Sequence, residues 1–354
     1  MKARILFWLK IGVSVGLLGY LLTMIDLDHL LEQLRNLDVR YLMLAFVLLL
    51  AQIGLGSLQW RLILRSDGVT MRLPFLFKTN LIGGFVSLFL PTSFGGDVYR
   101  VVAASGVNRD LAKSASSILF ARLCGFFALT SICMIGYVAL PEQPYGTLVV
   151  AFYVLGVTCF LILSSDAAIS FVNAFEIAIV KKAAKVLRSF RNYRTHRRLL
   201  VVVLFLGFAF QFNVVIINKV YTLAVGIDVD FAILLVIVPL IFLTDALPIS
   251  INGLGVRESA FAFFFVMNGL TVEQAVAVAL LVVAERYLLG LVGGLLLLAS
   301  VISSRTRPAG SDSDRGAPTS IAFLRQPAGG HDRGSAPDAK GGWPKTAGAP
   351  SRKN

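Results

Sequence analysis

Long apolar segments alternate with short polar segments along most of the chain. Six of them are long enough to cross a bilayer as helices, since about 20 apolar residues span its hydrocarbon core at a rise of about 1.5 Å each. They cover residues 5–25, 41–60, 115–140, 147–165, 199–225 and 272–303. The pattern predicts an all-α polytopic membrane protein with about six full spans.

Two further regions, 74–113 and 231–270, are apolar but interrupted. The first contains LPTSFGGDVYR at 90–100 and the second LPISINGLGVR at 247–257, with identical residues at five of the eleven offsets. Proline removes a backbone donor, and a glycine pair weakens a helix. Each region therefore predicts a broken helical hairpin in place of one continuous span.

Charges in the loops orient these segments. Residues 61–78 and 181–198 are rich in Lys and Arg, whereas 26–38 is acidic and 141–146 and 226–230 carry acids without Lys or Arg. Lys- and Arg-rich loops stay on the cytoplasmic side. We therefore expect both termini in the cytoplasm and the acidic loops outside.

This orientation constrains the two interrupted regions. Residues 79–113 must enter and leave on the cytoplasmic side, because the span after them exits to an acidic loop. Residues 231–270 must return to the outer side for the same reason. The two hairpins, whether re-entrant or short full crossings, are thus approached from opposite faces, as in inverted-repeat transporters.

The spacing of other residues supports an internal repeat. Arg61 precedes Gly68 by seven residues, and Lys219 precedes Gly226 by seven. The predicted organisation is a first span with an acidic outer loop, repeat unit A, an extra span with a basic amphipathic segment, repeat unit B and a disordered cytoplasmic tail. These parts cover 1–40, 41–140, 141–198, 199–303 and 304–354.

Composition agrees with a membrane protein and excludes several classes. The chain has 354 residues, 56% hydrophobic and 15% charged, with a mean hydropathy of +0.78. Its net charge of +13 fits cytoplasmic loops and affinity for anionic lipid headgroups, and we find no basic motif interleaved with aromatic residues for nucleic acid. The three Cys and three His form no ligand cluster, so we expect no metal and no cofactor.

The broken helices carry the candidate chemistry. A helix that restarts inside the membrane presents bare N–H groups to an anion, and arginine binds phosphate with two parallel hydrogen bonds. Ser93 and Ser250 are placed to cap the two restarts. Buried ion pairs, such as Asp97 with Arg100 at i,i+3, are the competing explanation. The candidate headgroup-binding residues are Pro91, Ser93, Gly96, Asp97, Arg100, Arg122, Ser250, Asn252, Gly253, Arg257, Glu258 and Arg286.

Four blocks of the sequence carry a family resemblance: LQWRLILRSDGV, FLPTSFGGDVYRV, FARLCGFFAL and LPISINGLGVRESAFAFFF. In this order they resemble the membrane region of lysylphosphatidylglycerol synthases/flippases, over residues 5–303. One family motif falls on Pro91, Gly96, Asp97 and Arg100; the other falls on Gly253, Gly255, Arg257 and Glu258.

The chain departs from the family pattern in two places. Ala121 replaces the acidic residue that often precedes the arginine present here as Arg122, which puts an ion pair there in doubt. Bifunctional members also carry a C-terminal aminoacyltransferase domain, where we expect only the disordered residues 304–354 here. The resemblance therefore implies the lipid-translocating part without the lysyl-transfer part.

These observations favour a cell-membrane transporter that moves an anionic or modified (glyco)lipid between leaflets. Without an ATP-binding loop, movement would be downhill or ion-coupled, with Asp97, Asp245, Glu258 and Glu285 as candidate proton carriers. One alternative is a transferase acting on a polyprenyl or phospholipid carrier, with Asp97 or Glu258 as base. Another is a scaffold that recruits a separate lipid-modifying enzyme through 181–198.

Overall fold

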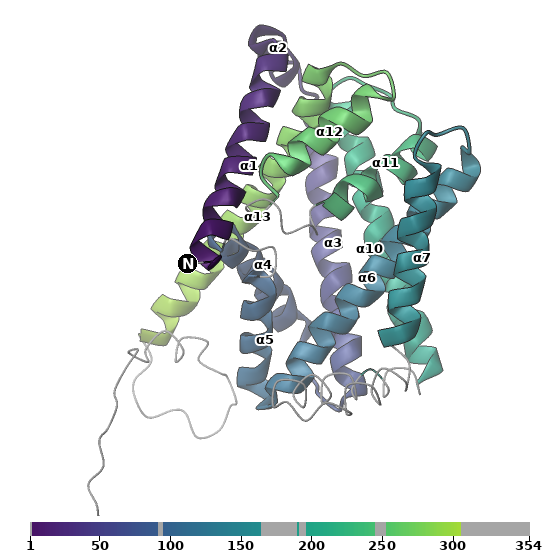
Figure 1. Ribbon diagram of the computed structural model, residues 1–354. Coiled ribbons are helices and arrows are strands. Elements are labelled where there is room, and N and C mark those ends of the chain that lie inside the picture. The colour runs from purple at the N-terminus through teal and green to yellow at the C-terminus, as the bar shows by residue number, and fades with distance from the viewer. Residues whose placement is uncertain (1, 91–94, 164–189, 191–195, 245–252, 306–354) are drawn as a thin grey trace, which may run out of the picture. The chain divides into compact units, whose positions relative to one another are not determined.

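The computed structural model describes residues 2–90, 95–163, 190, 196–244 and 253–305, and within these ranges the regular elements are helices (Figure 1). The helices are α1 (Lys2–Met24), α2 (Leu27–Arg35), α3 (Val39–Ser66), α4 (Leu73–Phe89), α5 (Gly95–Asn108), α6 (Leu111–Ala139), α7 (Gly146–Leu163), α10 (Arg197–Ala224), α11 (Phe231–Thr244), α12 (Val256–Val266) and α13 (Val272–Arg305). The predicted all-α class is confirmed.

Within the described ranges, five helices are long and apolar enough to cross a membrane: α3, α6, α7, α10 and α13. A sixth candidate span is the pair formed by residues 10–24 of α1 and by α2, which bend by 88° at the break between them. The number and positions agree with the hydrophobic pattern, and the chain is a polytopic membrane protein. The shorter apolar helices α4 and α11 lie in the two interrupted regions.

Acidic residues between the apolar runs start the helices that follow. The Asp38 carboxylate accepts the backbone N–H of Arg40 at 2.8 Å at the start of α3, and Asp110 accepts that of Ala112 at 3.0 Å at the start of α6. Such caps satisfy donors that have no partner inside the helix. These acids therefore set helix boundaries as well as charge.

Helices α3 and α10 end with the same local structure. Gly68 and Gly226 adopt positive φ angles of 75° and 83°. The backbone N–H of Val69 donates to the Leu64 carbonyl at 3.0 Å, and that of Ile227 donates to the Thr222 carbonyl at 2.9 Å. Both ends are glycine-terminated caps of the Schellman type, in which glycine is favoured because it has no Cβ.

The pair α4 and α5 returns to the end of the molecule from which it starts. Lys113, at the start of α6, donates from its ammonium to the backbone carbonyl of Asp67, at the end of α3, at 3.0 Å. The pair α11 and α12 lies toward the other end, where the Asn268 side chain approaches the Tyr145 hydroxyl at 3.3 Å. Figure 1 shows α4 with α5 low and α11 with α12 high in the view.

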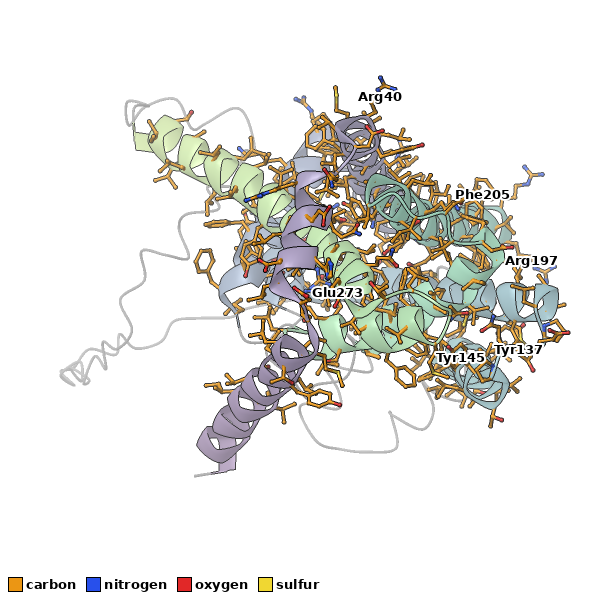
Figure 2. All side chains as sticks on the ribbon, turned by 90° about the horizontal axis from the view of Figure 1, so that it is seen from above. Arg40, Tyr137, Tyr145, Arg197, Phe205 and Glu273 are labelled. Atoms are coloured by element: carbon orange, nitrogen blue, oxygen red, sulfur yellow. The ribbon has the colours of Figure 1, made fainter. Side chains whose placement is uncertain are left out.

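Helices of one predicted unit pack against helices of the other unit, and the same kinds of pair occur in both directions. α3 packs along α10, α4 packs against α13, and α11 packs against α6. A polar contact joins the connection before α2 to the first turn of α13, where the backbone N–H of Asp26 donates to the Glu273 carboxylate at 3.3 Å; Glu273 is labelled in Figure 2. Each predicted hairpin therefore contacts the last long helix of the other unit.

Some predicted features lie outside the described residues. They are the candidate residues Pro91, Ser93, Ser250 and Asn252, the candidate proton carrier Asp245, most of the amphipathic segment 166–198, and residues 306–354 of the predicted tail.

Candidate functional site

Asp97, in the first turn of α5, binds two arginines from different helices. Its Oδ1 lies 2.7 Å from Nη1 of Arg100 on α5. Its Oδ2 contacts Arg122 on α6 twice. It lies 2.8 Å from Nη2 of Arg122 and accepts a hydrogen bond from Nε of the same side chain at 2.9 Å. Only 10% of the Asp97 side chain is exposed. The carboxylate therefore ties the start of α5 to the middle of α6.

Glycines bring α5 close to α4 beside this cluster. A Cβ added at Gly96 would overlap the backbone carbonyl of Gly83, and one added at Gly83 would lie 3.0 Å from Nε of Arg100. Any side chain at either position would separate the helices or displace the guanidinium. Gly83 and Gly96 therefore allow α5 to pack closely against α4 and fix the position of Arg100 beside it.

Arg122 lies deep along its helix and is accessible. It follows the first residue of α6, Leu111, by eleven positions in a helix of 29 residues, or about 16 Å along the axis. Its side chain is 54% exposed. A charged side chain at this depth is costly in hydrocarbon and is normally directed at a polar partner or a water-filled space.

The second motif has a different environment. Arg257 and Glu258 open α12 with side chains only 2% and 6% exposed, and Nη2 of Arg257 lies 3.2 Å from Oε1 of Glu258. The other oxygen of Glu258 accepts the backbone N–H of Gly255 at 2.7 Å. Glu258 therefore caps its own helix and neutralises its neighbour.

A glycine of the second motif also lies against α1. Gly253 and Gly255 have φ angles of 80° and 82°, and a Cβ at Gly255 would lie 2.8 Å from the carbonyl oxygen of Ser14 on α1. Glycine is needed at Gly255 both for the backbone angle and for the approach of α1. This arrangement explains the second glycine of the Gly-x-Gly-x-Arg-Glu block.

A further charged group lies at the centre of α13. The Tyr221 hydroxyl on α10 donates to Oε2 of Glu285 at 2.9 Å. Glu285 also interacts electrostatically with Arg286 and with Arg257 of α12. Tyr221 was not a candidate from sequence, because its partner lies 64 positions away and no motif surrounds the tyrosine.

The structure thus brings together three of the candidate residues, Asp97, Arg100 and Arg122. The Asp97–Arg100 pair at i,i+3, which is the explanation that competes with headgroup binding, is present, and Arg122 joins it from α6. Although Ala121 stands where an acidic residue is common, Arg122 is paired through Asp97, 25 positions earlier. Gly253, Arg257 and Glu258 gather at the start of α12, and Arg286 interacts with Glu285.

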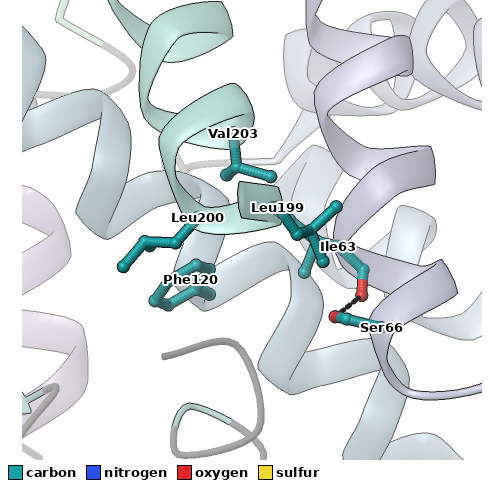
Figure 3. Close-up of a pocket in the computed structure, with 6 residues that line it drawn as sticks. All are labelled: Ile63, Ser66, Phe120, Leu199, Leu200 and Val203. Atoms are coloured by element: carbon teal, nitrogen blue, oxygen red, sulfur yellow. Dashed lines mark hydrogen bonds between the residues drawn. The ribbon is translucent and has the colours of Figure 1, made fainter. Parts of the chain in front are cut away.

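One pocket lies apart from all of these residues (Figure 3). It is lined by Ile63, Ser66, Phe120, Leu199, Leu200 and Val203. The Ser66 hydroxyl donates to the Ile63 carbonyl at 2.6 Å, so the described lining residues offer apolar surface and no charged group. Over the described parts of the chain, no three His, Cys, Asp or Glu side chains are grouped for a metal ion.

Comparison with known proteins gave one family. The family model described as "Lysylphosphatidylglycerol synthase TM region" matches residues 7–294. Searches of curated proteins and of solved structures returned no match. The matched range contains both motifs, the Asp97 cluster and every described candidate residue.

Proposed function

This chain belongs to the family of the lysylphosphatidylglycerol synthase TM region, and from that premise we propose that it is a flippase-like lipid transporter. It moves an anionic or modified (glyco)lipid between the leaflets of the cell membrane. The headgroup passes along the arginines while the acyl chains stay in the bilayer.

The accessible arginine in the middle of α6 carries this proposal. Arg122 is 54% exposed although it pairs with Asp97, and it lies at a depth where a guanidinium without a polar partner is costly. A phosphate-bearing headgroup crossing between leaflets would pass this depth. Guanidinium binds phosphate oxygens with strong, paired hydrogen bonds.

The reciprocal packing of helices supports a transporter. α4 against α13 and α11 against α6 are the contacts expected of an inverted repeat with two re-entrant hairpins, one from each face. Transporters of this kind place their substrate site near the midplane, where broken helices meet. We assign the headgroup site to the first hairpin and the adjoining α6, with Gly96, Asp97, Arg100 and Arg122.

The second hairpin has a supporting role in this proposal. Arg257 is almost fully buried and neutralised by Glu258, which also caps α12. Replacing either residue would leave a buried charge without its neighbour, so such variants would lose activity through the fold of the hairpin. Loss of activity at Arg257 alone would therefore not identify a lipid contact.

Lipid movement in vesicles of defined composition tests the proposal. The full chain is reconstituted with fluorescent phosphatidylglycerol, and the fraction of dye reached by an impermeant quencher is followed over time. Wild-type protein should speed the exposure of inner-leaflet dye, and Arg122→Gln should slow it by about tenfold or more, as expected for loss of a charge-assisted hydrogen bond. Arg40→Gln is the matched control, because this exposed arginine at the start of α3 points away from the helices (Figure 2).

Other outcomes would point to other functions. A covalently altered lipid, detected by mass spectrometry of the same vesicles, would favour a transferase. Absence of both lipid movement and a new product would favour a scaffold. Equal rates for wild-type and Arg122→Gln would remove Arg122 from the transport path.

A further inference from the structure

The two carboxylate oxygens of Asp97 accept hydrogen bonds from two different helices, α5 and α6. Oδ1 faces Arg100 and Oδ2 receives both Nε and Nη2 of Arg122. A phosphodiester offers the same feature, two partially negative oxygens on one centre that accept from guanidinium N–H groups. Either anion therefore satisfies the same donors of Arg122.

The charges of this cluster do not balance. Asp97 contributes one negative charge, and Arg100 and Arg122 contribute one positive charge each, which leaves an excess of one positive charge. The group at α12 differs, because Arg257 there is matched by Glu258 within 3.2 Å. Unbalanced charge in the membrane interior is costly. One phosphodiester, with its single negative charge, would balance the first cluster.

The three side chains also differ in freedom. Arg100 is 24% exposed and Asp97 10%, and Arg100 is held against Gly83. Arg122 is the most exposed of the three and has a long side chain with several rotatable bonds. Arg122 can therefore leave Asp97 by changing rotamer, while Arg100 keeps the carboxylate in place.

We propose that Asp97 is a displaceable counter-ion for Arg122. In the lipid-free protein the Asp97 carboxylate accepts the hydrogen bonds of the Arg122 guanidinium. A phosphodiester headgroup takes its place, and the connection between the start of α5 and the middle of α6 opens when the headgroup binds. Arg122 selects for the phosphodiester, and competition from Asp97 keeps the affinity low enough for release. The identification of the ligand as a lipid rests on the proposed function.

Equilibrium binding tests the competition. The full-length protein in detergent is titrated with dihexanoyl phosphatidylglycerol, and dihexanoylglycerol serves as the neutral counterpart. Asp97→Asn should tighten binding of the phosphodiester by about tenfold, the typical value of one charge-assisted hydrogen bond. Arg122→Gln should weaken it, and by a larger factor in the Asp97→Asn background than in wild type, because the competitor is then absent. Arg40→Gln should leave both affinities unchanged.

The opposite pattern would overturn the proposal. If the carboxylate only holds the helices together, Asp97→Asn weakens binding, and adding Arg122→Gln to it changes nothing further. Equal affinity of wild-type protein for the phosphodiester and for the neutral lipid would also overturn it.

A measurement on the unmutated chain covers the case in which Asp97→Asn does not fold. An arginine-specific dicarbonyl reagent is applied, and modification of each arginine is read by peptide mass spectrometry. Dihexanoyl phosphatidylglycerol should protect Arg122 at least about tenfold better than dihexanoylglycerol, as its charge-assisted hydrogen bonds require. Absence of selective protection would overturn the proposal. Equal protection by inorganic phosphate would keep the displaceable counter-ion but assign it to free phosphate.

These readouts separate the proposal from the transport function. Selective binding at Arg122 without lipid movement in vesicles would leave the counter-ion exchange standing in a lipid-binding protein. Lipid movement that is insensitive to Asp97→Asn, with no change in affinity, would leave the transporter standing and remove the exchange.

Discussion

Gly293 on α13 lies so close to Leu81 on α4 that a Cβ on the glycine would overlap the Leu81 backbone. Gly136 on α6 lies in the same way against Leu235 on α11, with a Cβ only 2.7 Å from the Leu235 side chain. The two glycines are 157 positions apart, the same separation as between the arginines that end the two quoted motifs. The repeat predicted from the sequence would make these two crossings equivalent positions.

The first prediction concerns these two crossings. Gly293→Ala and Gly136→Ala should each lower the free energy of unfolding by about 1–3 kcal/mol, because an added methyl overpacks a close helix contact. Gly84→Ala is the matched control on α4, since nothing lies within 4 Å of a Cβ there. Thermal unfolding of the purified protein in detergent measures all three. A neutral Gly293→Ala would show that the crossing is loose.

The second prediction separates backbone strain from contact at the start of α12. Gly255 and Gly269 have similar φ angles, 82° and 87°, but only Gly255 is close to α1, through Ser14. Gly269→Ala should cost about 1 kcal/mol of stability from its positive φ alone. Gly255→Ala should cost more, because its methyl also displaces α1. Equal losses of stability would mean that α1 does not hold this position.

The third prediction tests whether the ends of α3 and α10 are energetically alike. Gly68→Ala and Gly226→Ala should each destabilise the protein by about 1 kcal/mol, since both glycines adopt positive φ in open space. Asn at either position should restore part of the loss, because Asn tolerates this conformation. Unfolding curves measured side by side check the comparison. A large difference between the two sites would contradict equivalent caps.

The fourth prediction concerns orientation in the membrane. Glu142 lies in the exposed connection between α6 and α7, and Thr70 in the exposed connection between α3 and α4. In a Cys159→Ser background, where the native Cys124 and Cys133 are buried, Glu142→Cys should react with an impermeant thiol reagent on intact cells. Thr70→Cys should react only after permeabilisation, as the Lys- and Arg-rich loops require. The reverse labelling pattern would invert the assigned topology.

The sequence by itself determined the long helices but not α2. Residues 26–38 were predicted as an acidic loop, whereas Asp26 caps the helix Leu27–Arg35, in which Leu30 is buried. A run of apolar residues that enters a bilayer must satisfy its backbone hydrogen bonds internally, so hydrophobic length alone predicts α3, α6, α7, α10 and α13. The spacing from Arg61 to Gly68 and from Lys219 to Gly226 indicated an internal repeat, and the structure adds that Gly68 and Gly226 end α3 and α10 with positive φ, a local preference of glycine.

Only the tertiary structure decided which side chains meet. Arg122 pairs with Asp97 across two helices, and the Tyr221 hydroxyl donates to Glu285. Gly293 packs closely against the Leu81 backbone. No local sequence pattern connects the two residues of any of these pairs. In a membrane, lipid and protein interior are about equally apolar, so a hydrophobic pattern does not tell which face of a helix contacts another helix. Helix contacts depend instead on small residues and polar partners far apart in the chain, and these are defined only once the helices are packed.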